Sequence, residues 1–154
     1  MIRPIMNVQF AQRAVIIRQR RILLLQKSQG DVNYALRWEL PGGRLEDSES
    51  LDEQLQREVR EEVGLEVSPQ EPLALWMWRL ASTPQAPPVV AVARYCIEAE
   101  PAAKVSFEAQ DEGDNIRDYA WVDVAEIEHI ELIDNSRAPL RAAIAALGRS
   151  GRLP

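Results

Sequence analysis

Apolar residues fall into short runs rich in Val, Ile and Leu, separated by polar segments that contain Gly or Pro. Runs of this length and composition favour β-strands. The first two runs flank the charged segment 18–21 and therefore predict a hairpin. The third run ends at Pro41-Gly42-Gly43, where proline stops strand pairing and two glycines permit a tight turn. The predicted strands are 14–17, 22–25, 38–40, 73–80, 89–97 and 117–122.

One amphipathic helix is predicted after the glycine turn. Ser50 and Glu53 form the S-x-x-E pattern of a capping box, and Gly64 is placed to end the helix. A four-residue apolar repeat gives the helix a face that we expect to be buried. The members of this repeat are Leu51, Leu55, Val59 and Val63.

A second helix is expected near the C-terminus. It is predicted to begin at Pro139 and to close at Gly148, after which the tail 148–154 should be frayed. Its apolar positions are Leu140, Ala143, Ile144 and Leu147.

The remaining segments complete the outline of the fold. Segment 1–10 is expected to be an edge strand or an arm, 106–115 an acidic flexible loop, and 124–127 a short helical turn. The chain shows neither an internal repeat nor a linker, so residues 1–154 are predicted to form one domain with its core at about 8–148. Mixed strands with an inserted helix and a terminal helix predict an α/β sandwich.

Composition narrows the class of protein and its partners. The chain has 154 residues, 46% hydrophobic and 27% charged, which is typical of a soluble globular domain. The net charge of -6 disfavours nucleic acid as a partner. The single cysteine, Cys96, permits no intrachain disulfide. Because no apolar run is long enough to span a membrane, we expect a cytoplasmic protein without a membrane partner.

Three glutamates on the first helix carry the main chemical signal. Glu58, Glu61 and Glu62 stand at i, i+3 and i+4, so they share one helix face and repel one another. A solvated charged face is the common explanation for such a run. A hard divalent cation, which prefers oxygen ligands, would also relieve the repulsion.

The spacing around these glutamates decides between the two explanations. Gly43 is followed at fixed intervals by Glu49, then Arg57-Glu58-Val59, Glu61-Glu62 and Gly64-Leu65. This pattern resembles a complete Nudix box, Gx5Ex7REUxEExGU with U aliphatic, and the preceding Trp-Glu-Leu-Pro-Gly resembles its usual lead-in. The box covers 23 residues, 43–65, and favours the metal site.

The resemblance implies a fold and a reaction. Nudix proteins are typically α/β/α sandwiches with a mixed central sheet, and they hydrolyse a nucleoside diphosphate linked to another moiety, X, with Mg²⁺ or Mn²⁺. Water attacks phosphorus directly. By position, the metal ligands would be Glu58, Glu61 and Glu62, joined by the carbonyl of Gly43. Arg57 would orient a glutamate, with Glu49 as its partner.

Other site residues are less well defined by the sequence. The general base is Glu58 or an acid from 108–118, where Glu112 is preferred over Asp111 and Asp118. A phosphate contact is expected from Arg44, ahead of Arg18, Lys27, Arg79 and Arg94.

Aromatic and lone polar residues leave alternatives open. Trp76 and Trp78 share one face of a strand, where they could stack a purine, cover a dimer interface or pack in the core. Asn135 is expected not to read a base edge. His129, the only histidine, is expected on the surface, and Cys96 in the core.

The preferred function is hydrolysis of a small-molecule nucleotide, a (deoxy)nucleoside triphosphate, with a damaged nucleotide as one possibility. The alternatives are an ADP-ribose or nucleotide-sugar pyrophosphatase, an RNA-end pyrophosphohydrolase, and a non-catalytic nucleotide-sensing module. The identity of X is expected to depend on loops 28–37, 82–88 and 106–118, and a homodimer is left open.

Overall fold

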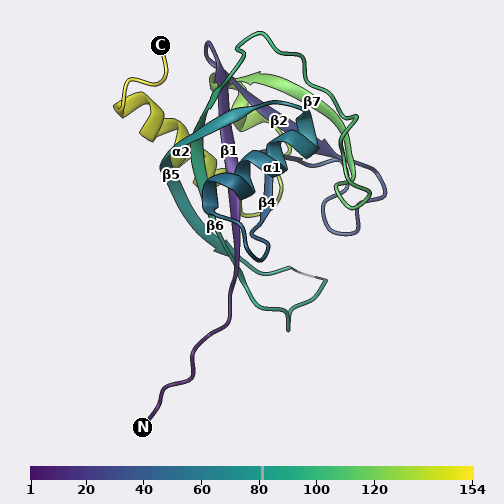
Figure 1. The fold of residues 1–154 in the computed structure, drawn as a ribbon, viewed down its shortest axis with the longest axis vertical. Coiled ribbons are helices and arrows are strands. Elements are labelled where there is room, and N and C mark those ends of the chain that lie inside the picture. Colours follow the sequence, from purple (N-terminus) through teal and green to yellow (C-terminus); the bar gives the residue numbers. More distant parts are fainter. Residues whose placement is uncertain (81) are drawn as a thin grey trace.

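The computed structural model describes residues 1–80 and 82–154. Four strands precede the first helix, and three more strands precede the two helical elements at the C-terminal end (Figure 1). The elements are β1 (Gln9–Arg18), β2 (Arg21–Lys27), β3 (Trp38–Glu39), β4 (Gly42–Arg44), α1 (Leu51–Val63), β5 (Val67–Trp78), β6 (Val89–Glu98), β7 (Ile116–Asp123), the 3-10 helix η1 (Val124–His129) and α2 (Arg137–Arg149).

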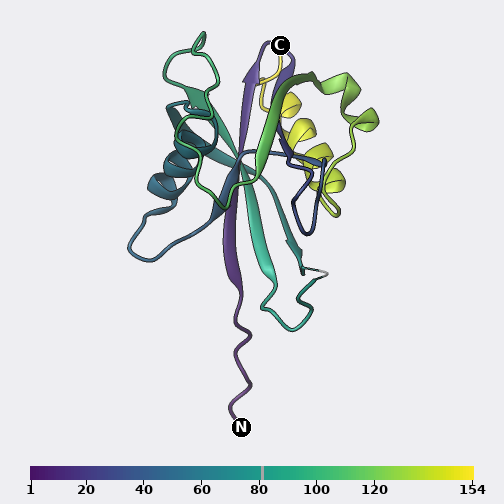
Figure 2. The same ribbon diagram turned by 90° about the vertical axis from the view of Figure 1, so that its right-hand side faces the viewer.

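The strands form a mixed sheet with the order β3-β2-β1-β6-β5. The predicted hairpin is confirmed, because β1 and β2 pair antiparallel with Ile17 opposite Ile22. β1 runs parallel to β6, while β4 pairs with β1 and β7 with β2. β1 therefore lies in the middle of the sheet. Of the two alternatives expected for 1–10, an edge strand or an arm, the arm is confirmed for residues 1–8, which are extended and exposed (Figure 2).

Helices α1 and α2 lie on opposite sides of the central strands (Figure 2). Each helix covers its own apolar cluster, with Leu55, Val59 and Val63 on the α1 side and Leu140, Ala143 and Leu147 on the α2 side. The predicted α/β/α sandwich with a mixed sheet is therefore confirmed.

The apolar face of α1 differs from the prediction at its first turn. Leu51 is 47% exposed, because this turn extends past the apolar cluster, and the side-chain amide of Gln12 donates to the Leu51 carbonyl instead. The buried face is completed by three polar side chains, Gln54, Glu58 and Glu62. Burial of two carboxylates marks this helix as more than a structural support.

Strand β5 is longer than the predicted strand 73–80. It begins at Val67 and passes through Pro69 and Pro72, where its register with β6 shifts. β5 is an edge strand, and an edge strand tolerates proline because one side of its backbone needs no partner.

The C-terminal prediction is also corrected. α2 begins at Arg137, before Pro139, and continues through Gly148 to Arg149. The tail is not frayed: the Arg152 N–H donates to the Leu147 carbonyl at 2.9 Å, and Leu153 packs against the α2 cluster. Long-range packing, which the local sequence does not encode, holds this segment.

Within residues 1–80 and 82–154, no helix is long and apolar enough to cross a bilayer.

Candidate active site

The glycine turn between β4 and α1 brings the backbone against two buried glutamates. Gly42 has a φ of +148°, and its N–H donates to a carboxylate oxygen of Glu62 at 2.6 Å. At Gly43, a Cβ would lie 2.5 Å from the Glu58 carboxylate, so only glycine leaves room for that carboxylate. Both glycines are therefore required by close contact with α1 as well as by the turn.

The orientation of α1 is fixed at both ends. Ser50 and Glu53 form the predicted capping box, in which each side chain accepts from the other residue's N–H. Gly64 ends the helix in the left-handed conformation, with φ of 70°. These caps determine which residues of α1 face the glycine turn.

A buried amide pair supports the Gly43 carbonyl, and the sequence analysis did not identify it. The side-chain amide of Gln54 donates to the Gly43 carbonyl at 2.9 Å, and Gln12 donates to the Gln54 side-chain oxygen at 2.7 Å. Both glutamines are fully buried. Gln54 lies one helical turn before Glu58, and this spacing was the only available signal.

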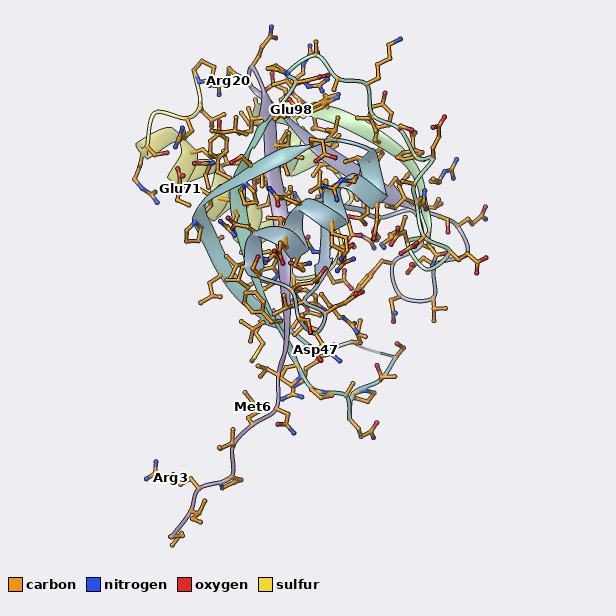
Figure 3. All side chains as sticks on the ribbon, viewed as in Figure 1. Arg3, Met6, Arg20, Asp47, Glu71 and Glu98 are labelled. Atoms are coloured by element: carbon orange, nitrogen blue, oxygen red, sulfur yellow. The ribbon has the colours of Figure 1, made fainter. Side chains whose placement is uncertain are left out.

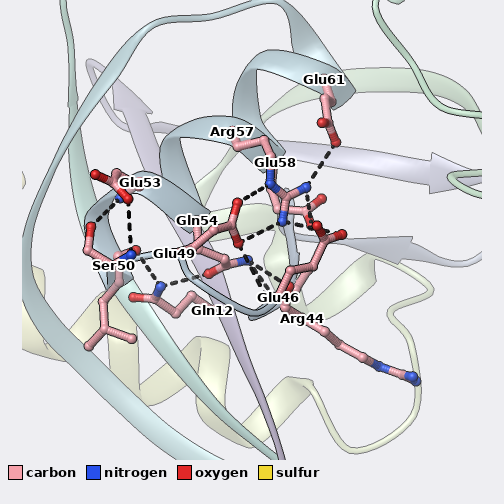
Figure 4. A network of polar contacts seen from close by, with 12 residues as sticks. Gln12, Arg44, Glu46, Glu49, Ser50, Glu53, Gln54, Arg57, Glu58 and Glu61 are labelled. Atoms are coloured by element: carbon pink, nitrogen blue, oxygen red, sulfur yellow. Dashed lines mark hydrogen bonds and ion pairs between the residues drawn. The ribbon is translucent and has the colours of Figure 1, made fainter.

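Arg57 contacts four glutamates, Glu46, Glu49, Glu58 and Glu61 (Figure 4). Its guanidinium makes a two-pronged contact with Glu49, through Nε and through Nη2, the latter at 3.1 Å. Nη1 lies 3.2 Å from a carboxylate oxygen of Glu61 and 3.1 Å from one of Glu58. Arg57 thus contacts its predicted partner Glu49 and holds Glu58 and Glu61 in place, while the role of this pair in catalysis stays a prediction.

Burial sets the electrostatics of the two innermost glutamates. Glu58 is 8% exposed and Glu62 is 3% exposed. Burial raises the pKa of Glu58 to about 7, although neighbouring Arg57 opposes the shift. Burial also raises the pKa of Glu62 well above its ordinary value, with further contributions from Glu39 and Glu58. Burial also raises the pKa of Glu61, although Glu61 is more exposed than the other two glutamates. A cation beside these groups would stabilise their ionised forms.

This donor set suits a hard divalent cation. Two carboxylates from α1 and the Gly43 carbonyl supply only oxygen. Among the described residues, no three acidic, histidine or cysteine side chains converge into a ready cage. A complete cage is not required, because Mg²⁺ binds few carboxylates, keeps several waters and accepts substrate phosphates as ligands.

A second ionic cluster lies behind Glu62. Glu39 contacts Lys27 at 3.1 Å through one oxygen and Arg13 at 3.4 Å through the other. Arg13 also donates to the carbonyls of Leu40 and Gly42, both at 3.3 Å. Lys27 had been considered as a phosphate contact, whereas Arg13 and Glu39 had not been singled out. Glu39 belongs to the Trp-Glu-Leu-Pro-Gly lead-in, which was the available signal.

The acidic loop 106–115 brings a different acid toward the site from the one preferred on sequence grounds. Glu112 is exposed and stays a prediction. Asp114 is half-buried, and its charge contributes to the raised pKa of both Glu58 and Glu61. Its backbone carbonyl accepts from Lys27 at 3.0 Å, which ties the loop to the Glu39 cluster. Nothing in the sequence distinguishes Asp114 from the other acids of this loop.

Most of the remaining cationic candidates are engaged elsewhere. Arg18 pairs with Glu98 at 2.6 Å and lies over the ring of Trp121, while Arg94 pairs with Asp52 at 2.7 Å. Arg44 is exposed, and its side chain points away from the Arg57 cluster (Figure 4). Its phosphate contact therefore stays a prediction.

A cleft adjoins the Glu39 cluster on the α2 side of the sheet. Its empty space amounts to about 560 Å³, part of it continuous with bulk solvent. Trp76 and Trp78 line one wall with their rings stacked 6.1 Å apart, and Tyr34 and Asp134 also border it. Arg13 and Glu39 line the cleft as well, so they connect it to the buried glutamates.

His129 and Cys96 lie where the sequence predicts, and Asn135 lies outside the cleft. His129 is exposed, and Cys96 is buried in the core. Asn135 is exposed and has a φ of 65°, outside the residues that line the cleft.

A family model described as NUDIX domain matches residues 9–144. The chain belongs to the NUDIX domain family. The predicted Nudix resemblance is thereby confirmed, and the chain is a Nudix hydrolase.

Parts of the chain are similar to proteins named as nucleotide phosphatases. It is 44% identical over 64 residues to 8-oxo-dGDP phosphatase NUDT18 from Danio rerio, a match that covers 41% of this chain and 19% of the zebrafish protein. It is 52% identical over 31 residues to 8-oxo-dGTP diphosphatase from Proteus vulgaris, covering 20% of this chain and 28% of that protein. The chain thus spans about a fifth to a quarter of these relatives' lengths.

Structural similarity extends over nearly the whole chain. The MutT protein from Methanosarcina mazei Go1 is 25% identical, with a TM-score of 0.69, over 96% of this chain and 97% of the other.

The raised pKa of Glu58 predicts how stability depends on pH without metal. Folding lifts this pKa from 4.5 to about 7, so the folded state binds a proton more tightly than the unfolded state in that range. The free energy of unfolding should therefore fall as pH rises from about 4.5 to about 7. Thermal unfolding in chelator across this range measures the slope, and Glu58→Gln should reduce it. An equal slope in wild type and Glu58→Gln would contradict the prediction.

Proposed function

We propose that this Nudix hydrolase catalyses metal-dependent cleavage of a diphosphate linkage in a (deoxy)nucleoside triphosphate or diphosphate. The observation that carries the proposal is the convergence of buried Glu58 and Glu62 on the Gly42-Gly43 turn, next to a cleft with aromatic walls. Closely spaced, buried carboxylates suit a site that binds Mg²⁺ or Mn²⁺ together with phosphates.

The residues of α1 and the glycine turn would hold the cation and the reacting water. Glu58, Glu62 and the Gly43 carbonyl are the proposed ligands, with Glu61 at the exposed side. When bound, the cation neutralises charge on the diphosphate and lowers the pKa of a bound water. Arg57, held by Glu49, keeps Glu58 and Glu61 in position.

A carboxylate must take the proton of the attacking water. Glu58 is our first candidate, because its buried carboxylate lies against Gly43, among the proposed metal ligands. Asp114 and the predicted Glu112 are the candidates from the loop. Attack of the water on phosphorus breaks the bond to the bridging oxygen, and two phosphate products leave.

The nucleoside is proposed to bind in the cleft. Trp76 and Tyr34 offer aromatic surfaces to a base, and Asp134 offers an acceptor to the N–H groups of a guanine-type edge. Arg13 lies between this cleft and the glycine turn, where it could contact the phosphate next to the ribose. The names of the relatives make oxidised guanine deoxynucleotides the first substrates to test.

The proposal is tested with a panel of substrates under Mg²⁺ and Mn²⁺. It should contain 8-oxo-dGTP, 8-oxo-dGDP, dGTP, ADP-ribose, a 5′-triphosphorylated RNA and inorganic tripolyphosphate, which lacks a nucleoside. We expect at least one deoxyguanosine nucleotide to be hydrolysed, with kcat/KM at least about tenfold above that of tripolyphosphate, since base stacking contributes roughly 1–3 kcal/mol.

Other outcomes of this screen separate the alternatives. Preferred turnover of ADP-ribose or of the RNA end would reassign X. Nucleotide binding by calorimetry without turnover of any compound would support a sensing module instead. Turnover that persists in excess chelator would contradict the metal requirement.

A further inference from the structure

An apolar surface lies on the face of β5 and β6 opposite the cleft. Along β5, Trp76 and Trp78 face the cleft, so Leu75 and Met77 point to the other side, where they are 71% and 53% exposed. Cross-strand pairing places Val92 beside Leu75 and Val90 beside Met77. We call Leu75, Met77, Val90 and Val92 the β5–β6 patch.

This patch lies on the α1 side of the sheet but past the first turn of α1. Gln12, the neighbour of Val92 on β1, reaches the Leu51 carbonyl in that first turn. The next row of the sheet holds Phe10, Val90 and Met77, and α1 does not extend over it. Leu51 at the border is itself half exposed. Contiguous exposed apolar side chains of this kind mark interaction surfaces.

The arm 1–8 supplies a matching apolar surface. It continues directly from β1 and projects away from the body of the protein, as the side chains of Arg3 and Met6 show (Figure 3). In a strand alternate residues share a face, so on a partner sheet that extends β1 the face of Phe10 would be continued by Val8, Met6, Pro4 and Ile2. All of these are apolar, and Met6 is 59% exposed. Arg3 is the only charged side chain of the arm.

We propose that two copies of this chain associate by reciprocal exchange, with the arm of each copy lying on the β5–β6 patch of the other. A twofold axis relates the two copies, so the arm of each copy meets the patch of the other in two equivalent contacts. Eight extended residues span about 26 Å, enough to cross several strands. The arm points away from its own patch, which favours a second copy as the occupant (Figures 1 and 2).

Molecular mass in solution tests the assembly. Light scattering and sedimentation of the full chain should give twice the monomer mass at micromolar concentration. Met6→Asp and Met77→Asp should each raise the dissociation constant of the dimer at least about tenfold, because each substitution places a charge in an apolar interface. Val32→Asp is the matched control, since Val32 is equally apolar and 87% exposed but lies outside the arm and patch. A monomer at all concentrations, or a dimer indifferent to both variants, would overturn the proposal.

Disulfide trapping tests the exchange itself. Met6→Cys protein mixed with isotope-labelled Met77→Cys protein should form a mixed disulfide dimer under mild oxidation, whereas Met6→Cys mixed with Val32→Cys should not. If the Met6→Cys/Met77→Cys double variant instead forms its bond only within one chain, the arm docks on its own patch and exchange is wrong. These readouts are masses, so they stand apart from any result on hydrolysis.

Discussion

Glu62→Gln is expected to lower kcat by roughly two to four orders of magnitude while leaving the fold intact. The glutamine keeps the shape of the side chain and can still accept the Gly42 N–H through its oxygen. It removes a negative charge that burial already disfavours, so the melting temperature should hold or rise. What is lost is a proposed metal ligand, and losing several kcal/mol of transition-state stabilisation corresponds to this range.

Steady-state kinetics at saturating Mg²⁺ and titration of Mn²⁺ binding measure the two effects separately. Glu66→Gln is the matched control, because Glu66 lies just beyond the same helix but pairs with Arg60 on the surface. That control should keep kcat within about twofold, as exposed ion pairs contribute little. If Glu62→Gln retained the wild-type kcat, Glu62 would not be a metal ligand, and the proposed metal site would rest on Glu58.

The two glycines of the turn should fail in different ways when replaced by alanine. In Gly43→Ala, the new Cβ meets the Glu58 carboxylate at 2.5 Å. That group ends a flexible side chain, so it can move aside without unfolding the protein, but it then leaves the Gly43 carbonyl. We expect kcat to fall about a hundredfold or more, with a small change in melting temperature.

Gly42→Ala is the comparison that makes this result specific. Its Cβ would lie 2.1 Å from the Gln12 backbone carbonyl, and its φ of +148° is strained for any side chain. Neither the backbone of central strand β1 nor this φ can relax cheaply, so we expect a loss of about 3 kcal/mol or more in the free energy of unfolding. Urea denaturation and kinetics on both variants separate the cases. A Gly43→Ala protein as unstable as Gly42→Ala would argue that Gly43 serves the fold alone.

Local patterns predicted the parts of this fold that depend on neighbouring residues. The hairpin of β1 and β2 follows from two apolar runs around a charged turn, and both caps of α1 follow from Ser50, Glu53 and Gly64. The edge position of β5, by contrast, depends on which strands pair. That pairing explains why the strand can pass through Pro69 and Pro72, although the predicted strand begins only at residue 73.

The burial of individual side chains on α1 does not follow from the local pattern. Leu51 belongs to a regular apolar repeat yet is exposed, while Gln54, Glu58 and Glu62 are buried on the same helix. A helical repeat specifies which residues share a face, but the neighbours of that face come from distant segments. The glycine turn and Gln12 provide polar partners, and these make burial of polar side chains affordable.

The sequence by itself determined the family and predicted the residues of the candidate metal site, because the box 43–65 contains the signals for both within one turn and one helix. Only the tertiary structure joined Arg13, Lys27 and Glu39 in one ionic cluster, brought the charge of Asp114 near Glu58, and opened the cleft beside Trp76. These residues are far apart along the chain, and their spacing carries no periodic signal. Their proximity results from the packing of β1, β2, β5 and the loops, which local propensity does not encode.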